Sequence, residues 1–163
     1  MMRIGHSTDL HRLKAGKSLI LGGIRIDSPV ESVGHSDADC LLHSVSEALL
    51  GALALGDLGT HFPDTDDKHK GMDSAAIVRY VKQLVDEKRY CIHNIDCMVF
   101  LERPKLAPYI LRVRESIALL LDIGVGQVSV KATTGEKIGL VGTGQAIVCE
   151  TVVLVSERER LDG

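Results

Sequence analysis

A carboxylate and two imidazoles in the first third of the chain have the residue types that bind a divalent transition metal. Asp9 and His11 are two residues apart, so on an extended segment their side chains point the same way. Alone, such a pair is ordinarily a surface Asp–His contact. With His43 added, the set predicts a catalytic zinc site, because such sites use three protein ligands and leave a fourth position for water or substrate.

The segment around His43 predicts a helix from Asp39 to about Leu55. Apolar residues recur there at helical spacing, while Asp39, His43 and Glu47 are four residues apart and share another face. A polar stripe adds no burial energy to a helix rich in Leu and Ala, so a functional site explains it better. For His43 alone, the alternative is a hydrogen-bonded histidine of the core.

The run His35-Ser36-Asp37 lies just before this predicted helix. We reject a catalytic triad, because triad residues meet in space and are seldom adjacent in sequence. His35 and Ser36 are instead candidate hydrogen-bond donors to a phosphate or hydroxyl group. Ser36 and Asp37 are also candidate N-cap residues, with Ser36 and Asp39 approximating a capping box, and both roles can hold together.

A polar loop after the helix contains Asp57, Asp64 and Asp66. Its length in a compact domain favours a functional loop. Clustered carboxylates could accept hydrogen bonds from a polyol substrate, and a solvated turn is the alternative. A calcium loop of the EF-hand type is excluded, since its Gly and distal Glu are missing at their offsets.

A Gly-rich turn near the C-terminus carries Thr133, Thr134 and Glu136 between two lysines. Hydroxyls and backbone amides suit phosphate oxygens, and a single carboxylate suits a magnesium ion that keeps its other contacts for water and phosphate. The turn is not a Walker P-loop, whose spacing is absent. On these residues alone, an ordinary turn at the end of a strand is the favoured interpretation.

The remaining pattern predicts a mixed α/β layer. It comprises one sheet of about four strands with helices on one face, ferredoxin-like, plus a small N-terminal hairpin. No repeat or linker divides the chain, so residues 1–163 are expected to form a single catalytic domain. The predicted strands are 2–9, 94–102, 128–133 and 146–155, the hairpin is 18–26, the helices are 39–55, 73–88 and 106–122, one helical turn lies within 135–144, and the tail 156–163 is expected to fray.

Composition narrows the class of protein. The net charge of −3 argues against a nucleic-acid partner. The four cysteines are scattered without a C-x-x-C pair, so we expect small buried hydrophobes in a reducing, cytoplasmic compartment. No leader segment is visible, and the apolar stretches are too short and interrupted for a membrane span.

Taken together, these residues resemble the 2-C-methyl-D-erythritol 2,4-cyclodiphosphate synthases, lyases of the non-mevalonate route to isoprenoid precursors. The resemblance covers about residues 2–155, and its specificity comes from many motifs in order. Those motifs are Arg3-Ile4-Gly5-His6, Asp9-x-His11, His35-Ser36-Asp37-x-Asp39 with His43, Gly56-Asp57-Leu58-Gly59, Phe62-Pro63-Asp64-Thr65-Asp66, Pro104-Lys105 and Lys131-Ala132-Thr133-Thr134 with Glu136-Lys137.

The resemblance implies a reaction and two metals. The 2-phosphate of 4-diphosphocytidyl-2-C-methyl-D-erythritol 2-phosphate would attack the β-phosphorus, expel CMP and close a cyclic diphosphate. By the family's pattern, Asp9, His11 and His43 hold zinc, and Glu136 helps to place magnesium or manganese. Two cations and fixed donors would relieve the repulsion between the reacting anions.

The resemblance also implies the remaining roles. His35 and Thr134 would stabilise the transition state. A homotrimer with its sites between adjacent subunits is implied as well. Substrate would be bound at the erythritol end by Ser36, Asp57, Gly59, Phe62, Asp64 and Asp66, and in a cytidine and diphosphate pocket of residues 101–107 and 133–136 by Pro104, Lys105, Thr133 and Gly135.

Four positions depart from the family's pattern. Glu47 replaces an expected Asp, and Gly135 replaces a Thr, which removes one hydroxyl near the diphosphate. Leu140 and Thr143 stand where Phe and Arg are frequent, beside the base pocket and the trimer axis. Two rival functions remain: a metal-dependent phosphohydrolase, distinguished by its product, and a non-catalytic zinc-binding module, distinguished by a fourth protein ligand.

Overall fold

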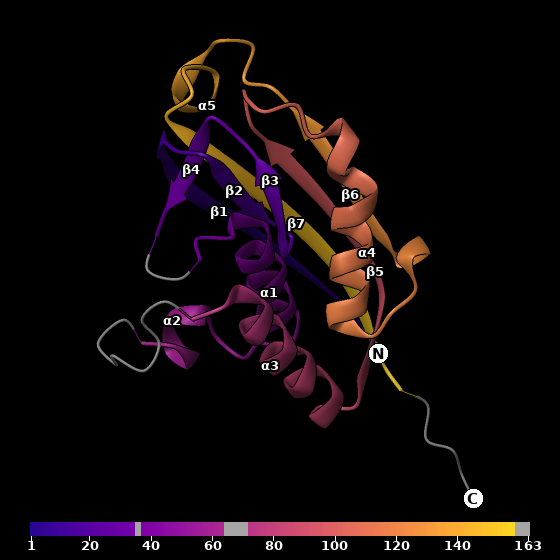
Figure 1. The fold of residues 1–163 in the computed structure, drawn as a ribbon. Helices are drawn as coiled ribbons and strands as arrows, with labels where there is room; N and C mark the ends of the chain where they lie inside the picture. The colour runs from indigo at the N-terminus through magenta and orange to yellow at the C-terminus, as the bar shows by residue number, and fades with distance from the viewer. Residues whose placement is uncertain (35–36, 64–71, 159–163) are drawn as a thin grey trace, which may run out of the picture.

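A five-stranded mixed sheet runs through the computed structural model, which describes residues 1–34, 37–63 and 72–158 (Figure 1). Its strand order is β4-β1-β7-β5-β6; only β5 and β6 are parallel, and every other neighbouring pair is antiparallel. A separate hairpin pairs β2 with β3. The strands are β1 (Met2–Ala15), β2 (Ser18–Leu21), β3 (Ile24–Asp27), β4 (Val30–Val33), β5 (Tyr90–Phe100), β6 (Val128–Thr133) and β7 (Ala146–Glu157).

The longer helices lie over one face of this sheet (Figure 1). Helix α1 packs on β1 and β7, while α4 packs on β6. The buried aliphatic side chains between helices and sheet form one continuous core. The helices are α1 (Cys40–Ala52), α2 (Leu58–His61), α3 (Ser74–Glu87), α4 (Ile110–Leu121) and α5 (Gly139–Gly142), with short 3₁₀ turns η2 (Ala107–Tyr109) and η3 (Val125–Gln127). Among the helices of the described ranges, none is long and apolar enough to cross a bilayer.

Helix α1 approaches β1 unusually closely, and Gly5 is the reason. A Cβ at Gly5 would lie 1.8 Å from the carbonyl oxygen of Ala48, so only glycine permits this contact between helix and strand. Alternate residues of β1 face the helices, and Asp9 and His11 are on that face with Gly5. The close approach therefore brings α1, and His43 with it, beside the polar side chains of β1.

The opposite face of the sheet carries exposed apolar side chains. Ile4 of β1 is 71% exposed, Leu10 is 53% exposed and Val152 of β7 is 42% exposed. In both strands the buried residues alternate with these exposed ones. One face of the sheet thus contacts the helices, while the other face of this single chain carries exposed aliphatic side chains.

The fold class is as predicted, with corrections in detail. The sheet has five strands rather than about four, because β4 (Val30–Val33) lies in a segment expected to be loop. Strand β1 extends to Ala15 instead of ending at residue 9, and β7 runs to Glu157, so the expected fraying from residue 156 is wrong there. Residues 159–163 lie outside the described part.

Three of the four cysteines are buried as expected. Cys40, Cys97 and Cys149 lie in the core, Cys91 is partly exposed, and all four are free thiols. The three buried cysteines contribute packing volume to the core between α1 and the central strands.

Candidate active site

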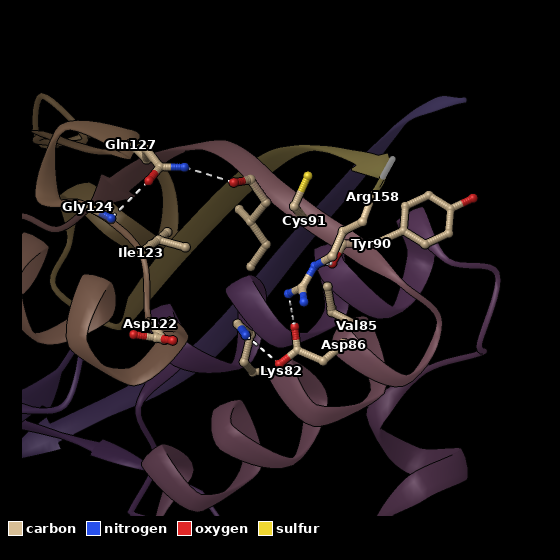
Figure 2. Close-up of a pocket in the computed structure, with 11 residues that line it drawn as sticks. Lys82, Val85, Asp86, Tyr90, Cys91, Asp122, Ile123, Gly124, Gln127 and Arg158 are labelled. Carbon is tan, nitrogen blue, oxygen red and sulfur yellow. Dashed lines mark hydrogen bonds and ion pairs between the residues drawn. The ribbon is translucent and has the colours of Figure 1, made fainter. Parts of the chain in front are cut away.

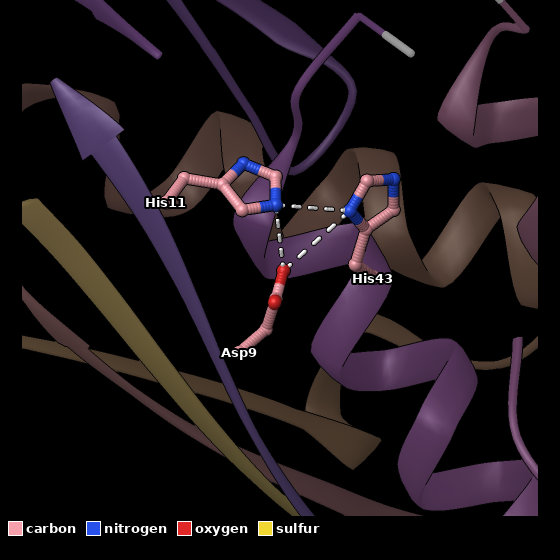
Figure 3. A group of neighbouring side chains, drawn as sticks. All are labelled: Asp9, His11 and His43. Atoms are coloured by element: carbon pink, nitrogen blue, oxygen red, sulfur yellow. Dashed lines mark hydrogen bonds and ion pairs between the residues drawn. The ribbon is translucent and has the colours of Figure 1, made fainter. Parts of the chain in front are cut away.

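Asp9, His11 and His43 converge into a compact triangle (Figure 3). Asp9 Oδ2 lies 3.0 Å from His11 Nε2 and 3.5 Å from His43 Nδ1, and the two imidazole nitrogens are 3.3 Å apart. Four-coordinate zinc with bonds of about 2.0–2.1 Å separates neighbouring ligand atoms by roughly 3.3 Å. The three atoms are therefore spaced as ligands of one tetrahedral ion.

The hydrogen bond at the far side of His11 determines its tautomer. His11 Nδ1 lies 3.0 Å from the carbonyl oxygen of Ala38, which can only accept, so Nδ1 carries the proton. The lone pair of Nε2 then faces Asp9. With no proton on the facing imidazole nitrogens, the buried Oδ2 of Asp9 accepts no hydrogen bond in the described part of the chain. Lone pairs that face one another around an unsatisfied carboxylate oxygen fit a bound cation.

The charges of the triangle shift two pKa values in opposite directions. Burial raises the pKa of Asp9, but hydrogen bonding and attraction from His11 and His43 outweigh burial and hold it well below its usual range. Burial lowers the pKa of His11, but contact with Asp9 outweighs it and raises the pKa overall. A proton on His11 and a metal ion are thus alternative partners for the same carboxylate.

A second group of predicted residues lines a hollow at the end of β6. Its volume is about 300 Å³, and it is formed where the segment after β5 meets the segment after β6. Its lining includes Pro104, Lys105 and Thr133, which are predicted from the sequence to bind substrate, and Thr134, which is predicted to have a catalytic role. Leu101, Glu102, Leu106, Ala107, Ile110 and Ala132 complete the lining.

The turn beside this hollow is held in one shape by short polar contacts. Thr134 Oγ1 donates to Glu136 Oε1 at 2.9 Å, and Glu136 has a φ of 51°, in the left-handed region. The amide of Gly135 donates to Glu102 Oε2 at 3.2 Å, which ties the two segments together. Sequence reasoning missed this use of the Glu102 carboxylate, since Glu102 belongs to no recognisable motif.

Gly135 is required by this turn geometry. A Cβ at Gly135 would lie 2.4 Å from the amide nitrogen of Gly142, and a Cβ at Gly142 would meet the Lys137 backbone at the same distance. Gly135, where the resemblance implies a Thr, is therefore matched to a tight backbone crossing. Leu140 is exposed and Thr143 Oγ1 donates to the carbonyl of Gly139, so both side chains belong to the same surface turn.

The loop after α1 holds other predicted residues near the surface. Asp57 caps α2 by accepting from the amide of Thr60 at 2.8 Å and from its hydroxyl at 2.6 Å, contacts that lower the pKa of Asp57. Gly59 lies in the first turn of α2, and Phe62 packs edge-on against Tyr80 at 5.2 Å between centroids. The predicted residues His35, Ser36, Asp64 and Asp66 lie outside the described residues.

The polar stripe of α1 divides into three different roles. Only His43 joins the triangle. Asp39 is fully buried and is the N-cap of α1, so the prediction of Ser36 or Asp37 as the cap is wrong. Glu47 accepts from the amide of Leu58 at 3.0 Å, and burial raises the pKa of its carboxyl group. Spacing on one helix face identified the polar side of α1 but not these separate tasks.

A further hollow of about 360 Å³ opens between α3, β5 and the end of α4 (Figure 2). Figure 2 shows Lys82 and Arg158 both turned toward Asp86, and each forms an ion pair with it. The side-chain amide of Gln127 is hydrogen-bonded to the backbone: it donates to the carbonyl of Ile92 and accepts from the amide of Gly124. These groups satisfy one another, so the triangle and the hollow beside β6 remain the better candidates for chemistry.

Comparisons with known proteins agree in sequence and in fold. A curated relative, the 2-C-methyl-D-erythritol 2,4-cyclodiphosphate synthase of Geobacter sulfurreducens, is 50% identical over 157 residues, which are 96% of this chain and 100% of the relative. An IspF of Plasmodium falciparum, solved as a CDP complex, is 35% identical with a TM-score of 0.86, covering 97% of each chain.

Two further comparisons set the family and its extent. The bifunctional IspDF of Campylobacter jejuni is 33% identical with a TM-score of 0.88, and the match covers 98% of this chain but 43% of that one. The family model described as the YgbB family matches residues 2–156. The chain therefore belongs to the YgbB family, in which its curated relatives at about half identity are 2-C-methyl-D-erythritol 2,4-cyclodiphosphate synthases.

Proposed function

We propose that this chain converts 4-diphosphocytidyl-2-C-methyl-D-erythritol 2-phosphate to 2-C-methyl-D-erythritol 2,4-cyclodiphosphate and CMP. An oxygen of the 2-phosphate attacks the β-phosphorus, and the bond from that phosphorus to the bridging oxygen breaks, so CMP leaves with that oxygen. Family membership supports the reaction. The observation that carries it is the triangle of Asp9, His11 and His43 around an unsatisfied, buried carboxylate oxygen.

Asp9, His11 and His43 would hold zinc, and Glu136 would contribute to a magnesium or manganese site. When bound, these cations supply Lewis-acid stabilisation of charge on the diphosphate. The protein's own contribution is to fix three ligand atoms at tetrahedral spacing, with His11 held in the correct tautomer by Ala38. Three ligands leave an open position, which favours a catalytic over a purely structural metal.

The substrate roles follow the two groups of residues. Pro104, Lys105, Thr133 and Gly135 would bind the cytidine and diphosphate at the hollow beside β6. The amine of Lys105 and the hydroxyl of Thr133 belong to residues of its lining, and the amide of Gly135 donates to Glu102, another lining residue. His35 and Thr134 would stabilise the charge that develops during attack. The erythritol phosphate end would be bound by Ser36, Asp57, Gly59, Phe62, Asp64 and Asp66.

A homotrimer with sites between subunits would bring these two groups together. Strands β7 and β5 separate β1, which carries Asp9 and His11, from β6, which ends at Thr133. Three strand spacings of about 4.8 Å place the two groups roughly 14 Å apart across the sheet. The apolar side chains exposed on the open face of the sheet, Ile4, Leu10 and Val152, would be covered by neighbouring copies. We further propose that the chain acts as one catalytic domain in the cytoplasm.

Phosphorus NMR of the products tests the proposal. The protein is incubated with the diphosphocytidyl substrate, magnesium and zinc. We expect CMP and the cyclic diphosphate in equal amounts. CMP with an open-chain product would show that the chain is a phosphohydrolase. If folded, metal-loaded protein shows no turnover, the chain is instead a non-catalytic zinc-binding module.

A further inference from the structure

The second nitrogen of His43 begins a hydrogen-bond relay that leads away from the metal triangle. His43 Nε2 lies 3.0 Å from Ser74 Oγ, and the Ser74 hydroxyl makes a short hydrogen bond to the Asp37 carboxylate. Ser74 is fully buried as the first residue of α3, so its hydroxyl is held in place by the fold. The three residues come from different segments. Asp37 precedes α1, His43 lies within α1, and Ser74, thirty-one positions after His43, begins α3.

The direction of each proton in the relay is fixed by its last member. An ionised carboxylate only accepts, so the Ser74 hydroxyl proton points to Asp37. Ser74 Oγ then has only lone pairs left for His43, and Nε2 must be the donor. With its proton on Nε2, His43 keeps the lone pair of Nδ1, the atom that faces Asp9 and His11. The relay therefore selects the tautomer that can bind a metal.

Asp37 is itself held on several sides, which makes the relay rigid. Its Oδ2 accepts from the amide of Ser74 and its Oδ1 from the amide of Asp39, both at 3.3 Å. The amide of Asp37 donates to the carbonyl of Met72. These contacts join the start of α1 to the start of α3, so the carboxylate cannot turn away without breaking bonds in both segments.

We infer that Ser74 and Asp37 are positioning residues for the metal, which set the tautomer and orientation of His43 without contacting the ion. The inference rests on the proposed function in so far as it takes Asp9, His11 and His43 to be the zinc ligands. Removing the partner of a ligating histidine typically costs 10–100-fold in metal affinity. We expect a loss of this size on Ser74→Ala and on Asp37→Asn.

Competition with a chromophoric chelator measures zinc affinity for the intact chain and its variants. Ser46→Ala is the matched control, because Ser46 is also a fully buried serine and, within the described ranges, its hydroxyl has no hydrogen-bond partner. Long-range nitrogen–proton NMR of the metal-free wild type and of each metal-free variant reports which ring nitrogen of His43 carries the proton when no zinc occupies Nδ1. We expect Nε2–H in the wild type and a weakened preference in Ser74→Ala, while Ser46→Ala matches the wild type in both measurements.

The outcomes separate the inference from the proposed function. A wild type that binds zinc tightly beside a Ser74→Ala variant of equal affinity overturns the inference and leaves the proposed function standing. A wild type that binds no zinc at the triangle overturns both. Urea unfolding of the same variants shows whether each one is fully folded without urea. A loss of zinc affinity in a fully folded variant is then not due to lower stability. Asp37→Asn gives an independent second test.

Discussion

Asp39 is predicted to stabilise the fold far more than an ordinary helix cap. Its Oδ1 accepts from the amides of Leu42, at 3.0 Å, and Gly22, at 2.9 Å, while Oδ2 accepts from the amide of Gly23 at 2.7 Å. One carboxylate thus caps α1 and also fixes the β2–β3 turn against it. Asp39 directly follows Ala38, whose carbonyl orients His11, so this contact supports the metal triangle as well.

The magnitude follows from the three amides. Loss of the cap alone costs about 1 kcal/mol. The buried amide of Gly22, left without an acceptor by Asp39→Ala, costs roughly 1–3 kcal/mol, and loss of the more exposed bond to the amide of Gly23 costs about 1 kcal/mol. We expect Asp39→Ala to lower the free energy of unfolding by about 3–5 kcal/mol, a large part of the roughly 5–15 kcal/mol typical of a domain.

Asp39→Asn is expected to fall between the wild type and Asp39→Ala. The amide oxygen can replace Oδ1 and keep the bonds to Gly22 and Leu42, but its NH₂ group would then face the amide of Gly23. The matched control is Asp73→Ala, which removes another N-cap whose contact with the amide of Ala75 is exposed, and should cost about 1 kcal/mol.

Urea unfolding followed by far-ultraviolet circular dichroism measures the series. The expected order of destabilisation is Asp39→Ala, then Asp39→Asn, then Asp73→Ala. Equal losses for Asp39→Ala and Asp73→Ala would refute this prediction, because they would show that the bonds from the amides of Gly22 and Gly23 contribute nothing beyond a helix cap.

Three other predictions concern the metals. His43→Ala should abolish turnover while the circular dichroism spectrum stays native, because α1 packs through its leucines; normal turnover would remove His43 from the zinc site. Glu136→Gln should raise the magnesium concentration needed for half-maximal activity, and an unchanged magnesium titration would exclude a metal role for Glu136. The raised pKa of His11 predicts that zinc affinity falls as pH drops through that pKa, beginning at a higher pH than for an ordinary histidine, since the proton then occupies Nε2 and competes with the metal. A zinc affinity, measured by chelator competition, that stays constant across this pH range would contradict the prediction.

The metal triangle was predictable because its evidence is local and chemical. Asp9 and His11 alternate on one strand, and His43 interrupts an apolar helix, so residue type and spacing both identify them. The structure confirms that the three side chains meet. Their assignment to zinc stays a prediction.

What could not be predicted depends on long-range contacts. Ser74 begins a helix of ordinary amphipathic pattern, and nothing in its neighbourhood indicates that it meets His43. Asp39 shares a face with His43 but turns to the glycines of a distant hairpin. Strand β4 is four residues long with two polar residues inside, so periodicity gives it no signal, and only pairing with β1 makes it a strand.

Zinc K-edge X-ray absorption of the zinc-loaded chain, with and without CDP, tests the central claim most directly. We expect two imidazole nitrogens, one carboxylate oxygen and one exchangeable oxygen around the zinc, and a change in this shell of nitrogen and oxygen ligands when CDP is added. A zinc–sulfur distance of about 2.3 Å, or a fourth protein ligand unaffected by CDP, would contradict an open catalytic site.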